Sequence, residues 1–519
     1  MTTEVRSPAQ QGTGREGSDA VFARWILLLA GLWCICWFIH ARHYWEDDAY
    51  IHLEFARNVA SGHGYSFNGL LVNGDTSPAW VLLLAGAHAL VPNWLIAGKI
   101  LAALGAIFAL AGTYSFGKHL TAGCPGQRSF AAAMVLLLAT NPYFCYWSFS
   151  GMETLTALGL GLWATLAAVK NTPTWPSFFL GCFLAGVTPV LRPEMTVLSG
   201  LLGLMLLWQW LRRPGGGISG RKLAALTLGL VLITAPLILW SAYALHAFGH
   251  VIPNTNAAKR AMPGESVVMR LLSVYGLGFP LVLVEIVGVA ILAAVRREIF
   301  RRDLDARNLF GILPAAWMFV LWLVVATIFY IFDHTWVQTR YIFVMAPGVM
   351  FAMLAFNYRR LPRWVYRLSL AGALLAGVAM SLVTTWPLVR NKSIGDEKIA
   401  GMAAYVRNDL PSDAPVAIYS IGEVAFDSQH PVIDIGGITR PGVIPYMLSG
   451  DSWGVVQWAW GQGARYFVSG VQPGPGAVLV YSVKTPVVGW SLHPRYYSRT
   501  ETLRIWKLPE SLDSLPRGR

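Results

Sequence analysis

Charged residues are scarce in this chain. Only 13% of its 519 residues are charged, whereas soluble proteins carry about 25%. Hydrophobic residues make up 55% of the sequence. A chain with so little charge cannot cover a water-exposed surface with polar side chains, which excludes a soluble globular enzyme.

Cysteine is also rare, and the patterns of common cofactor sites are missing. The five cysteines all lie in the N-terminal half, and none stands at the Cys/His spacing of a metal site. The glycines of the C-terminal part do not form G-x-G-x-x-G, the usual dinucleotide fingerprint. We therefore expect no disulfide framework and no dinucleotide site.

Long apolar runs are the dominant feature of the sequence. A helix needs about 20 apolar residues to cross a bilayer, and runs near this length predict eleven transmembrane helices. They lie at 25–42, 95–116, 129–146, 154–170, 176–191, 195–211, 223–246, 271–295, 309–332, 341–356 and 368–386. The chain is thus predicted to be a polytopic α-helical membrane protein that contacts the lipid bilayer directly.

The net charge of +13 reflects membrane orientation and not binding to nucleic acid. Lys and Arg cluster in three short connections, at 212–222, 296–307 and 357–367. The positive-inside rule places these loops, and the N-terminal tail 1–24, in the cytoplasm. A full crossing by the run 78–91 would invert this arrangement, so we expect that run to be short, re-entrant or interfacial.

The last part of the chain has the composition of a soluble domain. Residues 391–519 follow the final apolar run and are expected outside the cytoplasm. An amphipathic pattern predicts a helix at Asp396–Leu410, and apolar runs predict strands at Val416–Ser420 and Val432–Ile435. Three parts follow: a cytoplasmic tail 1–24, a transmembrane domain 25–390 and an extracytoplasmic soluble α/β domain 391–519.

Three consecutive carboxylates, Glu46, Asp47 and Asp48, directly follow the first apolar run. One interpretation is that Asp47 or Asp48 caps the next helix, whose apolar stripe Ile51, Phe55 and Val59 would lie on the bilayer. The alternative is a general base with an orienting partner. A carboxylate at the membrane surface can take the proton of a sugar hydroxyl that attacks a lipid-linked donor.

Four cations stand where the orientation rule predicts few, on the outer side. They are Arg192, Lys259, Arg260 and Arg340. A lipid phosphate would offset their cost there, because Arg and Lys are the usual partners of phosphate. Snorkelling to the interface, or pairing with a local acid such as Glu194, is the alternative for any one of them.

Other candidates carry less information. Asp303 and Asp305 have the spacing of a metal-binding motif, but their Arg-rich surroundings favour a solvated helix surface. Glu153 opens a predicted transmembrane helix, where an acid suits the helix dipole. The acids Glu423, Asp427 and Asp434 of the C-terminal part fit either an acceptor site or turns.

Together these motifs resemble the GT-C superfamily of membrane glycosyltransferases. Within it the chain is most similar to the polyprenyl-phosphate-dependent arabinofuranosyltransferases that add terminal arabinofuranose to cell-wall arabinan. The resemblance spans about residues 25–440 and is carried by Asp47-Asp48-Ala49-Tyr50-Ile51, Phe55-Ala56-Arg57-Asn58, Gly62-His63-Gly64, Phe67-Asn68, Ser150-Gly151-Met152-Glu153, Arg192-Pro193-Glu194, Pro253-Asn254-Thr255, Ala258-Lys259, Arg340-Tyr341 and Ile421-Gly422. Residues 73–78 depart from the family's usual Glu-Gly-Tyr-Thr-Asn run.

The resemblance implies an inverting transfer of a sugar from a polyprenyl-phosphate donor to a glycan or glycoconjugate. The reaction would take place at the outer face of the bacterial plasma membrane, as part of cell-envelope synthesis. Asp47 matches the general base, and Asp48 orients a substrate. Arg192, Lys259 and Arg340, with the neighbouring Arg260, match positions beside the donor phosphate. Further candidate substrate contacts are Glu46, Tyr50, His63, Asn254, Glu153 and Glu194.

No cofactor is expected, because cationic side chains can stabilise the departing phosphate. Some members of the superfamily use divalent ions, so a metal stays unassigned. The acceptor is equally open: a pilin-like protein or a lipopolysaccharide precursor fits the same chemistry. A transporter or flippase for a lipid-linked sugar would also place charges along a pathway, although the sequence shows no convincing internal repeat.

Overall fold

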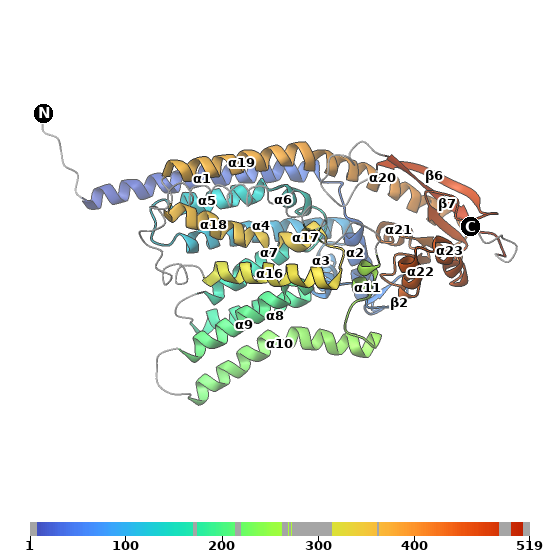
Figure 1. Cartoon of the computed structure of the whole chain (residues 1–519), viewed down its shortest axis with the longest axis horizontal. Coiled ribbons are helices and arrows are strands. Elements are labelled where there is room, and N and C mark those ends of the chain that lie inside the picture. The colour runs from blue at the N-terminus through green and yellow to red at the C-terminus, as the bar shows by residue number, and fades with distance from the viewer. Residues whose placement is uncertain are drawn as a thin grey trace.

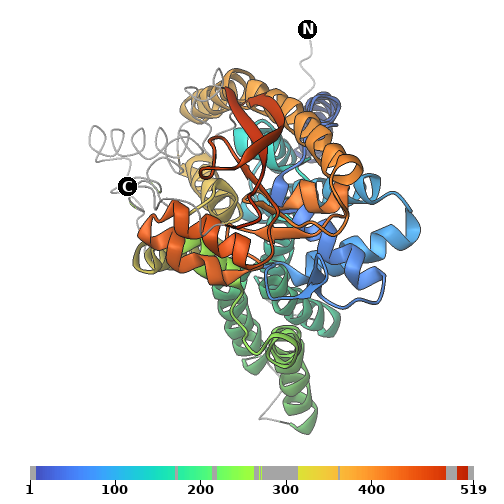
Figure 2. The same ribbon diagram turned by 90° about the vertical axis from the view of Figure 1, so that its right-hand side faces the viewer.

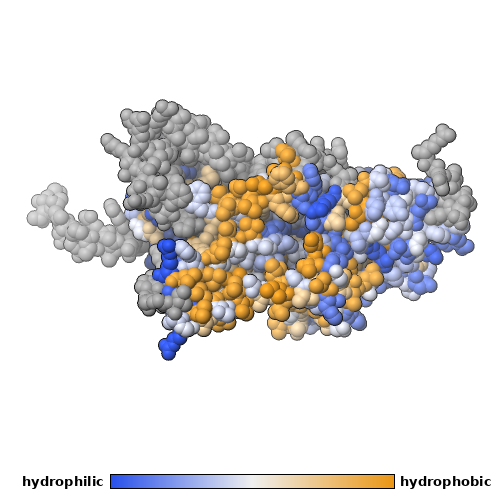
Figure 3. Space-filling model, turned by 60° about the horizontal axis from the view of Figure 1, so that its bottom comes forward, coloured by the Kyte–Doolittle hydropathy of each residue, from blue (hydrophilic) through white to orange (hydrophobic). Residues whose placement is uncertain are grey.

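The protein is a bundle of helices with an α/β domain at one end, as a computed structural model shows (Figure 1). The structure describes residues 8–169, 174–212, 219–261, 268, 271, 314–360, 363–486 and 500–511. Apolar side chains gather over the helical bundle, and polar side chains over the end that bears the C-terminal domain (Figure 3).

Helices make up the whole of the described bundle apart from short connections. They are α1 (Pro8–His40), α3 (Pro78–Leu90), α4 (Trp94–Leu120), α5 (Gln127–Ala139), α6 (Pro142–Trp147), α7 (Thr154–Ala168), α8 (Trp175–Leu191), α9 (Thr196–Leu211), α10 (Gly220–Phe248), α16 (Pro314–Asp333), α17 (Thr339–Phe343), α18 (Ala346–Arg360) and α19 (Arg363–Met380). Six stretches of the described chain are long and apolar enough to cross a membrane. The chain is a multi-pass membrane protein, as its sequence predicts.

Ten of the eleven predicted crossings coincide with described helices. The run 271–295, and the loop 296–307 with Asp303 and Asp305, lie outside the described residues, and five of the apolar helices are only 10–17 residues long. The number of crossings therefore stays a prediction. Helix α3 covers the run 78–91 and has 13 residues. At 1.5 Å per residue it spans about 20 Å, less than the ~30 Å bilayer core.

Close packing between α4 and α7 fixes where the N-terminus of α7 lies along the bundle. A Cβ on Gly105 of α4 would lie 2.1 Å from the Thr156 hydroxyl oxygen, so only glycine fits there. Small residues allow helix backbones to approach in this way. As a result Glu153, which immediately precedes α7, is held at the end of the bundle near the C-terminal domain.

The C-terminal domain contains a five-stranded sheet flanked by helices (Figure 2). Its elements are α20 (Trp386–Asp409), β3 (Val416–Ile418), α21 (Gly422–Ser428), β4 (Val432–Asp434), α22 (Ile444–Ser449), α23 (Ser452–Gly461), β5 (Tyr466–Ser469), β6 (Val478–Pro486) and β7 (Thr500–Lys507). The strand order is β4-β3-β5-β7-β6, with β4, β3 and β5 parallel and β7 antiparallel to both its neighbours.

The predicted helix and both predicted strands of this domain are confirmed. The helix is longer than expected, because α20 follows α19 through a π-helical turn at Ser381–Thr385 and runs unbroken past residue 391. One helical rod thus links the bundle to the domain, and the exact domain boundary stays a prediction.

Helix α2 (Asp47–Ala60) lies between the bundle and the C-terminal domain, in contact with α3 and α21. The prediction that its apolar stripe lies on the bilayer is wrong, since Ile51 is 5% exposed and Phe55 is fully buried. The Phe55 ring packs instead on Tyr65 and on Phe67 of the small hairpin β1 (Ser66–Phe67) and β2 (Leu70–Leu71).

The capping interpretation of the acidic segment is also wrong. Helix α2 begins at Asp47 itself, with Glu46 as its N-cap residue, and within this described segment no side chain caps the helix by a hydrogen bond. The carboxylates are engaged in contacts with distant parts of the chain instead, and these contacts build the site.

Candidate active site

Asp47 lies where the C-terminal domain meets the bundle. Its Oδ1 accepts a hydrogen bond of 3.0 Å from the backbone N–H of Glu423, at the start of α21. A Cβ on Gly422 would lie 2.0 Å from the Asp47 carbonyl oxygen, so glycine is required for α21 to come this close. The domain thereby holds the Asp47 carboxylate in a fixed orientation.

The two neighbouring carboxyl groups titrate differently. Burial, helped by the charge of Asp48, raises the pKa of Asp47 to about 6, against the opposing effect of the Glu423 and Gly422 N–H groups. Burial also acts on Asp48, but the nearby charges of Arg340 and Lys259 outweigh it and hold the Asp48 pKa below its usual value. Asp48 is thus ionised, while Asp47 exchanges protons near neutral pH, as a general base requires.

Three of the predicted cations converge on this pair of carboxylates. Arg340, on α17, forms an ion pair with Asp48, and Lys259, on α11 (Asn254–Arg260), donates to the Tyr341 hydroxyl. Arg192, at the end of α8, pairs with Glu153 and Glu194. The Nε atoms of Arg192 and Arg340 are buried and have no hydrogen-bond partner among the described residues.

Asp47, Asp48 and the three cations line one small cavity of about 60 Å³. One water molecule needs about 10–15 Å³ of cavity volume. The cavity therefore has room for a group of roughly four or five heavy atoms, which is the size of a phosphate. The charged and polar side chains in its lining are Asp47, Asp48, His52, Asp75, Thr76, Glu153, Arg192, Thr255, Lys259, Gln338, Arg340, Tyr419 and Ser420.

His52 and Asp75 are part of the site but were not selected from the sequence. One ring nitrogen of His52 bonds the Asp75 carboxylate, and the other lies 3.3 Å from Glu153. Burial lowers the His52 pKa, but the two carboxylates more than offset this and raise it to about 10. The spacing of His52 from Asp48, four residues along α2, is a signal that both share one helix face. Asp75 lies in the segment that departs from the family pattern, which gave no signal.

Other predicted site residues do not line this cavity. Arg260 is exposed and pairs with Asp333, outside the cavity lining. His63 lies on the surface beyond the end of α2. The backbone N–H of Asn254 bonds the Asn73 carbonyl at 2.8 Å, which fixes the start of α11 next to the cavity.

Glu46 and Tyr50 lie on the opposite side of the start of α2. Glu46 is buried, accepts hydrogen bonds from Tyr44 and Tyr146, and pairs with Lys392 of α20 at 3.3 Å. These bonds tie the first loop to the rod α20. Tyr50 faces a second, larger cavity, together with Glu423 and Asp427.

Asp434 has the contacts that the turn interpretation predicts, because it accepts from the backbone N–H groups of Gly436 and Thr439. Within the part of the chain that the structure describes, no group of three or more His, Cys, Asp or Glu side chains is placed to hold a metal ion. The expected absence of a cofactor stays a prediction.

Comparison with known proteins bears on the fold of the whole chain. No family model matches the sequence. A solved structure of ArnT from Cupriavidus metallidurans bound to undecaprenyl phosphate superimposes with a TM-score of 0.54 and 14% sequence identity, covering 92% of this chain and 98% of ArnT. The apo form of the same protein gives 0.52 over 92% and 97%. ArnT is a GT-C glycosyltransferase.

The chain has the GT-C fold. Its sequence is also similar to a curated relative, the terminal beta-(1->2)-arabinofuranosyltransferase of Mycobacterium tuberculosis (strain ATCC 25618 / H37Rv). The two are 28% identical over 54% of this chain and 46% of the relative, so the match spans less than half of the relative's length. The predicted GT-C fold and the resemblance to arabinofuranosyltransferases are confirmed.

Proposed function

We propose that this GT-C protein is an inverting glycosyltransferase, which moves arabinofuranose from a polyprenyl-phosphate donor to a saccharide hydroxyl. The observation that carries the proposal is the convergence, in one cavity, of the Asp47 carboxylate with Arg192, Lys259 and Arg340. The sugar follows from the arabinofuranosyltransferase activity for which the mycobacterial relative is named. The lipid carrier follows from ArnT, which was solved with undecaprenyl phosphate.

The reaction needs one proton acceptor and one cationic site for the leaving group. The acceptor hydroxyl oxygen attacks the anomeric carbon of the donor sugar, and the bond from that carbon to the phosphate oxygen breaks. The hydroxyl proton passes to the Asp47 carboxylate. In a single displacement of this kind the hydroxyl oxygen attacks from the face opposite the leaving phosphate. The configuration at the anomeric carbon therefore inverts.

The cations stabilise the phosphate as negative charge builds up on its oxygen. Lys259 donates to the Tyr341 hydroxyl and, among the residues that the structure describes, forms no ion pair, so its charge is available to the donor. Arg340 and Arg192 each have an unpartnered Nε in addition to their ion pairs. Asp48 and Glu153 fix the two guanidinium groups and so preorganise the phosphate site.

The site lies at the end of the bundle that carries the C-terminal domain, and the Arg-rich stretch at the end of α18 lies at the other end (Figure 1). With the basic end in the cytoplasm, the donor is used at the outer face of the plasma membrane. The C-terminal domain is then extracytoplasmic.

Purified protein in lipid nanodiscs is expected to transfer radiolabelled sugar from synthetic polyprenyl-phosphoryl-arabinofuranose to an arabinofuranosyl oligosaccharide. Polyprenyl-phosphoryl-glucose serves as the control donor and should give no product. Folded protein that transfers nothing contradicts the proposal. Movement of the labelled lipid across a vesicle membrane without any transfer would identify a transporter instead.

The pH dependence of transfer follows from the Asp47 pKa of about 6. Only the ionised carboxylate accepts a proton, so kcat should be constant above about pH 7 and fall about tenfold per pH unit below about pH 5.5. The measurement is kcat at saturating donor from about pH 4.5 to about pH 8, with size-exclusion profiles to confirm folded protein at each pH. A rate that stays constant down to pH 4.5 would remove Asp47 as the base.

A further inference from the structure

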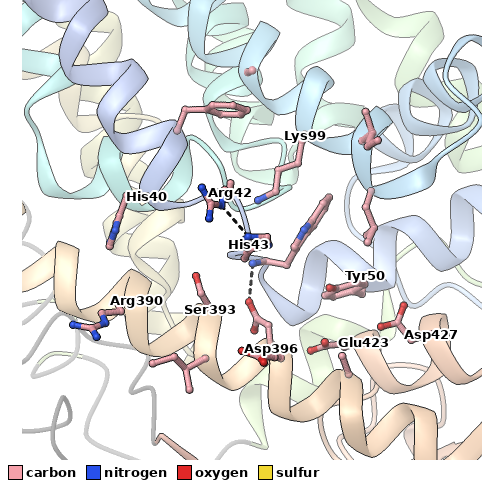
Figure 4. Close-up of a pocket in the computed structure, with 18 of the residues that line it drawn as sticks. His40, Arg42, His43, Tyr50, Lys99, Arg390, Ser393, Asp396, Glu423 and Asp427 are labelled. Carbon is pink, nitrogen blue, oxygen red and sulfur yellow. Dashed lines mark hydrogen bonds between the residues drawn. The ribbon is translucent and has the colours of Figure 1, made fainter.

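A second and much larger cavity, of about 1180 Å³, lies on the other side of the start of α2 (Figure 4). Its lining comes from the end of α1, the loop after α1, the start of α4, the rod α20 and helix α21. The proposed reaction uses none of these side chains. The lining changes in character along the cavity, from apolar through cationic to acidic.

The apolar wall continues onto the lipid-facing surface of the bundle. Ile96 and Ile100 of α4 line the cavity and are 53% and 45% exposed. Leu104 and Ile107, on the same face of α4 and further along it, are 55% and 62% exposed. Residues at this spacing form one stripe along a helix, so a hydrocarbon chain can extend from the cavity into the bilayer without leaving apolar surface.

Cationic side chains follow at the level of the membrane surface. His40 stacks on Trp386 with ring centroids 3.5 Å apart, and Trp side chains favour that level of a bilayer. Beside this pair, Arg42 and Arg390 line the cavity and are exposed. Among the described residues neither of the two arginines forms an ion pair, so both charges can bind a phosphate.

The third part of the lining suits sugar hydroxyls. Asp396, Glu423 and Asp427 lie around Tyr50 (Figure 4), and Asp396 also accepts the Trp45 N–H at 2.8 Å. Carboxyl groups hydrogen-bond sugar hydroxyls in either state, as acceptors when ionised and as both donor and acceptor when protonated. Because the backbone N–H of Glu423 bonds Asp47, this acidic end of the cavity adjoins the proposed base.

We propose that this cavity binds the acceptor, and that the acceptor is a saccharide anchored in the membrane through a lipid phosphate. The tail lies along α4, the phosphate between Arg42 and Arg390, and the sugars against Asp396, Glu423 and Asp427. The terminal hydroxyl then approaches Asp47 from the side opposite the donor phosphate. The proposal rests on the transferase function above, and it selects a lipid-linked saccharide over a protein or a soluble glycan.

Binding is measured first, without donor, so that no turnover takes place. The probes are a dodecyl-phosphate-linked arabinofuranosyl disaccharide and the same disaccharide without the dodecyl phosphate. The protein is held in phosphatidylcholine nanodiscs. We expect the lipid-linked probe to bind at least about tenfold more tightly, because its tail and phosphate add contacts that the free sugar lacks.

Two variants locate the binding site. Ala103 lies on the part of α4 that lines the cavity. Ala103→Trp fills the path of the tail and should lower the affinity for the lipid-linked probe about tenfold. Ala224→Trp, at an exposed position of α10 outside the cavity lining, is the matched control and should leave the affinity for this probe unchanged. In an Arg42→Gln/Arg390→Gln variant, the lipid-linked probe should bind no better than a dodecyl disaccharide without phosphate.

Each contrary result has a distinct meaning. Equal binding of the two probes, or equal effects of Ala103→Trp and Ala224→Trp, overturns the acceptor site. Displacement of the lipid-linked probe by phosphatidylglycerol at the same concentration means that the cavity holds bulk anionic lipid, which also overturns it. Transfer to the free disaccharide at the rate of the lipid-linked one refutes this inference and leaves the transferase intact. Cavity-dependent binding with no transfer refutes the proposed reaction instead.

Discussion

Replacing Asp47 with asparagine is expected to lower kcat for sugar transfer about 10³-fold, within the range that a general base contributes. The substitution is nearly isosteric, and the amide oxygen can still accept the Glu423 N–H. The contact between α21 and α2 should therefore survive, and only the proton acceptor is lost. The measurement is single-turnover transfer together with the thermal unfolding of the purified variant.

Asp413→Asn is the matched control, because Asp413 is exposed on the C-terminal domain, outside both cavity linings. It should transfer at the wild-type rate. The residual activity of Asp47→Asn should also no longer fall at acidic pH. An Asp47→Asn protein with normal kcat would show that another group takes the proton.

Replacing Arg340 with glutamine should have two separate effects. It removes a cation from the phosphate site, so kcat/KM for the donor should fall about 10²- to 10³-fold. It also leaves the partly buried Asp48 carboxylate without its ion-pair partner, which should lower stability by less than the about 3–5 kcal/mol of a fully buried pair. The Asp48 side chain is 23% exposed, so solvent compensates for part of the lost interaction.

A double variant separates the two effects. Asp48→Asn together with Arg340→Gln removes both charges of the pair, so the unfolding temperature should recover while donor kcat/KM stays low. Arg260→Gln is the control, since Arg260 pairs with Asp333 away from the cavity and should leave donor kcat/KM unchanged. If the double variant regains transfer as well as stability, Arg340 is a structural residue and does not bind the donor.

The overall class of the protein could be predicted from composition and hydrophobic runs. Helices that face lipid must be apolar on most of their surface. Because this requirement applies to each helix by itself, a run of consecutive residues is enough to reveal it. The same holds for the parallel β3-α21-β4 unit, whose two strands and turns follow each other directly. Strand β5 pairs with β3 from much later in the chain, and β7 lies between β5 and β6. No local pattern indicated either feature.

Several site residues were also identifiable in the sequence, because their chemistry does not suit their position. Carboxylates directly after a transmembrane run, and cations on the side that the orientation rule leaves poor in charge, need a partner or a function. This reasoning found Asp47, Asp48, Arg192, Lys259 and Arg340. It could not separate Arg260 from them, since adjacent residues on a short helix carry the same local signal but point in different directions.

Sequence alone determined that the chain is a polytopic membrane protein with an acidic motif and a terminal α/β domain. It also predicted cations on the side of the membrane where the orientation rule expects few. The tertiary structure alone decided which of these groups meet. The Asp48–Arg340 pair joins residues 292 positions apart, and the Asp47–Glu423 bond joins residues 376 apart. It also turned the expected interfacial helix α2 into a buried one and brought His52 and Asp75 into the site. Such contacts depend on how whole helices and the domain pack against each other, and that packing energy is summed over many distant side chains, not encoded at any one of them.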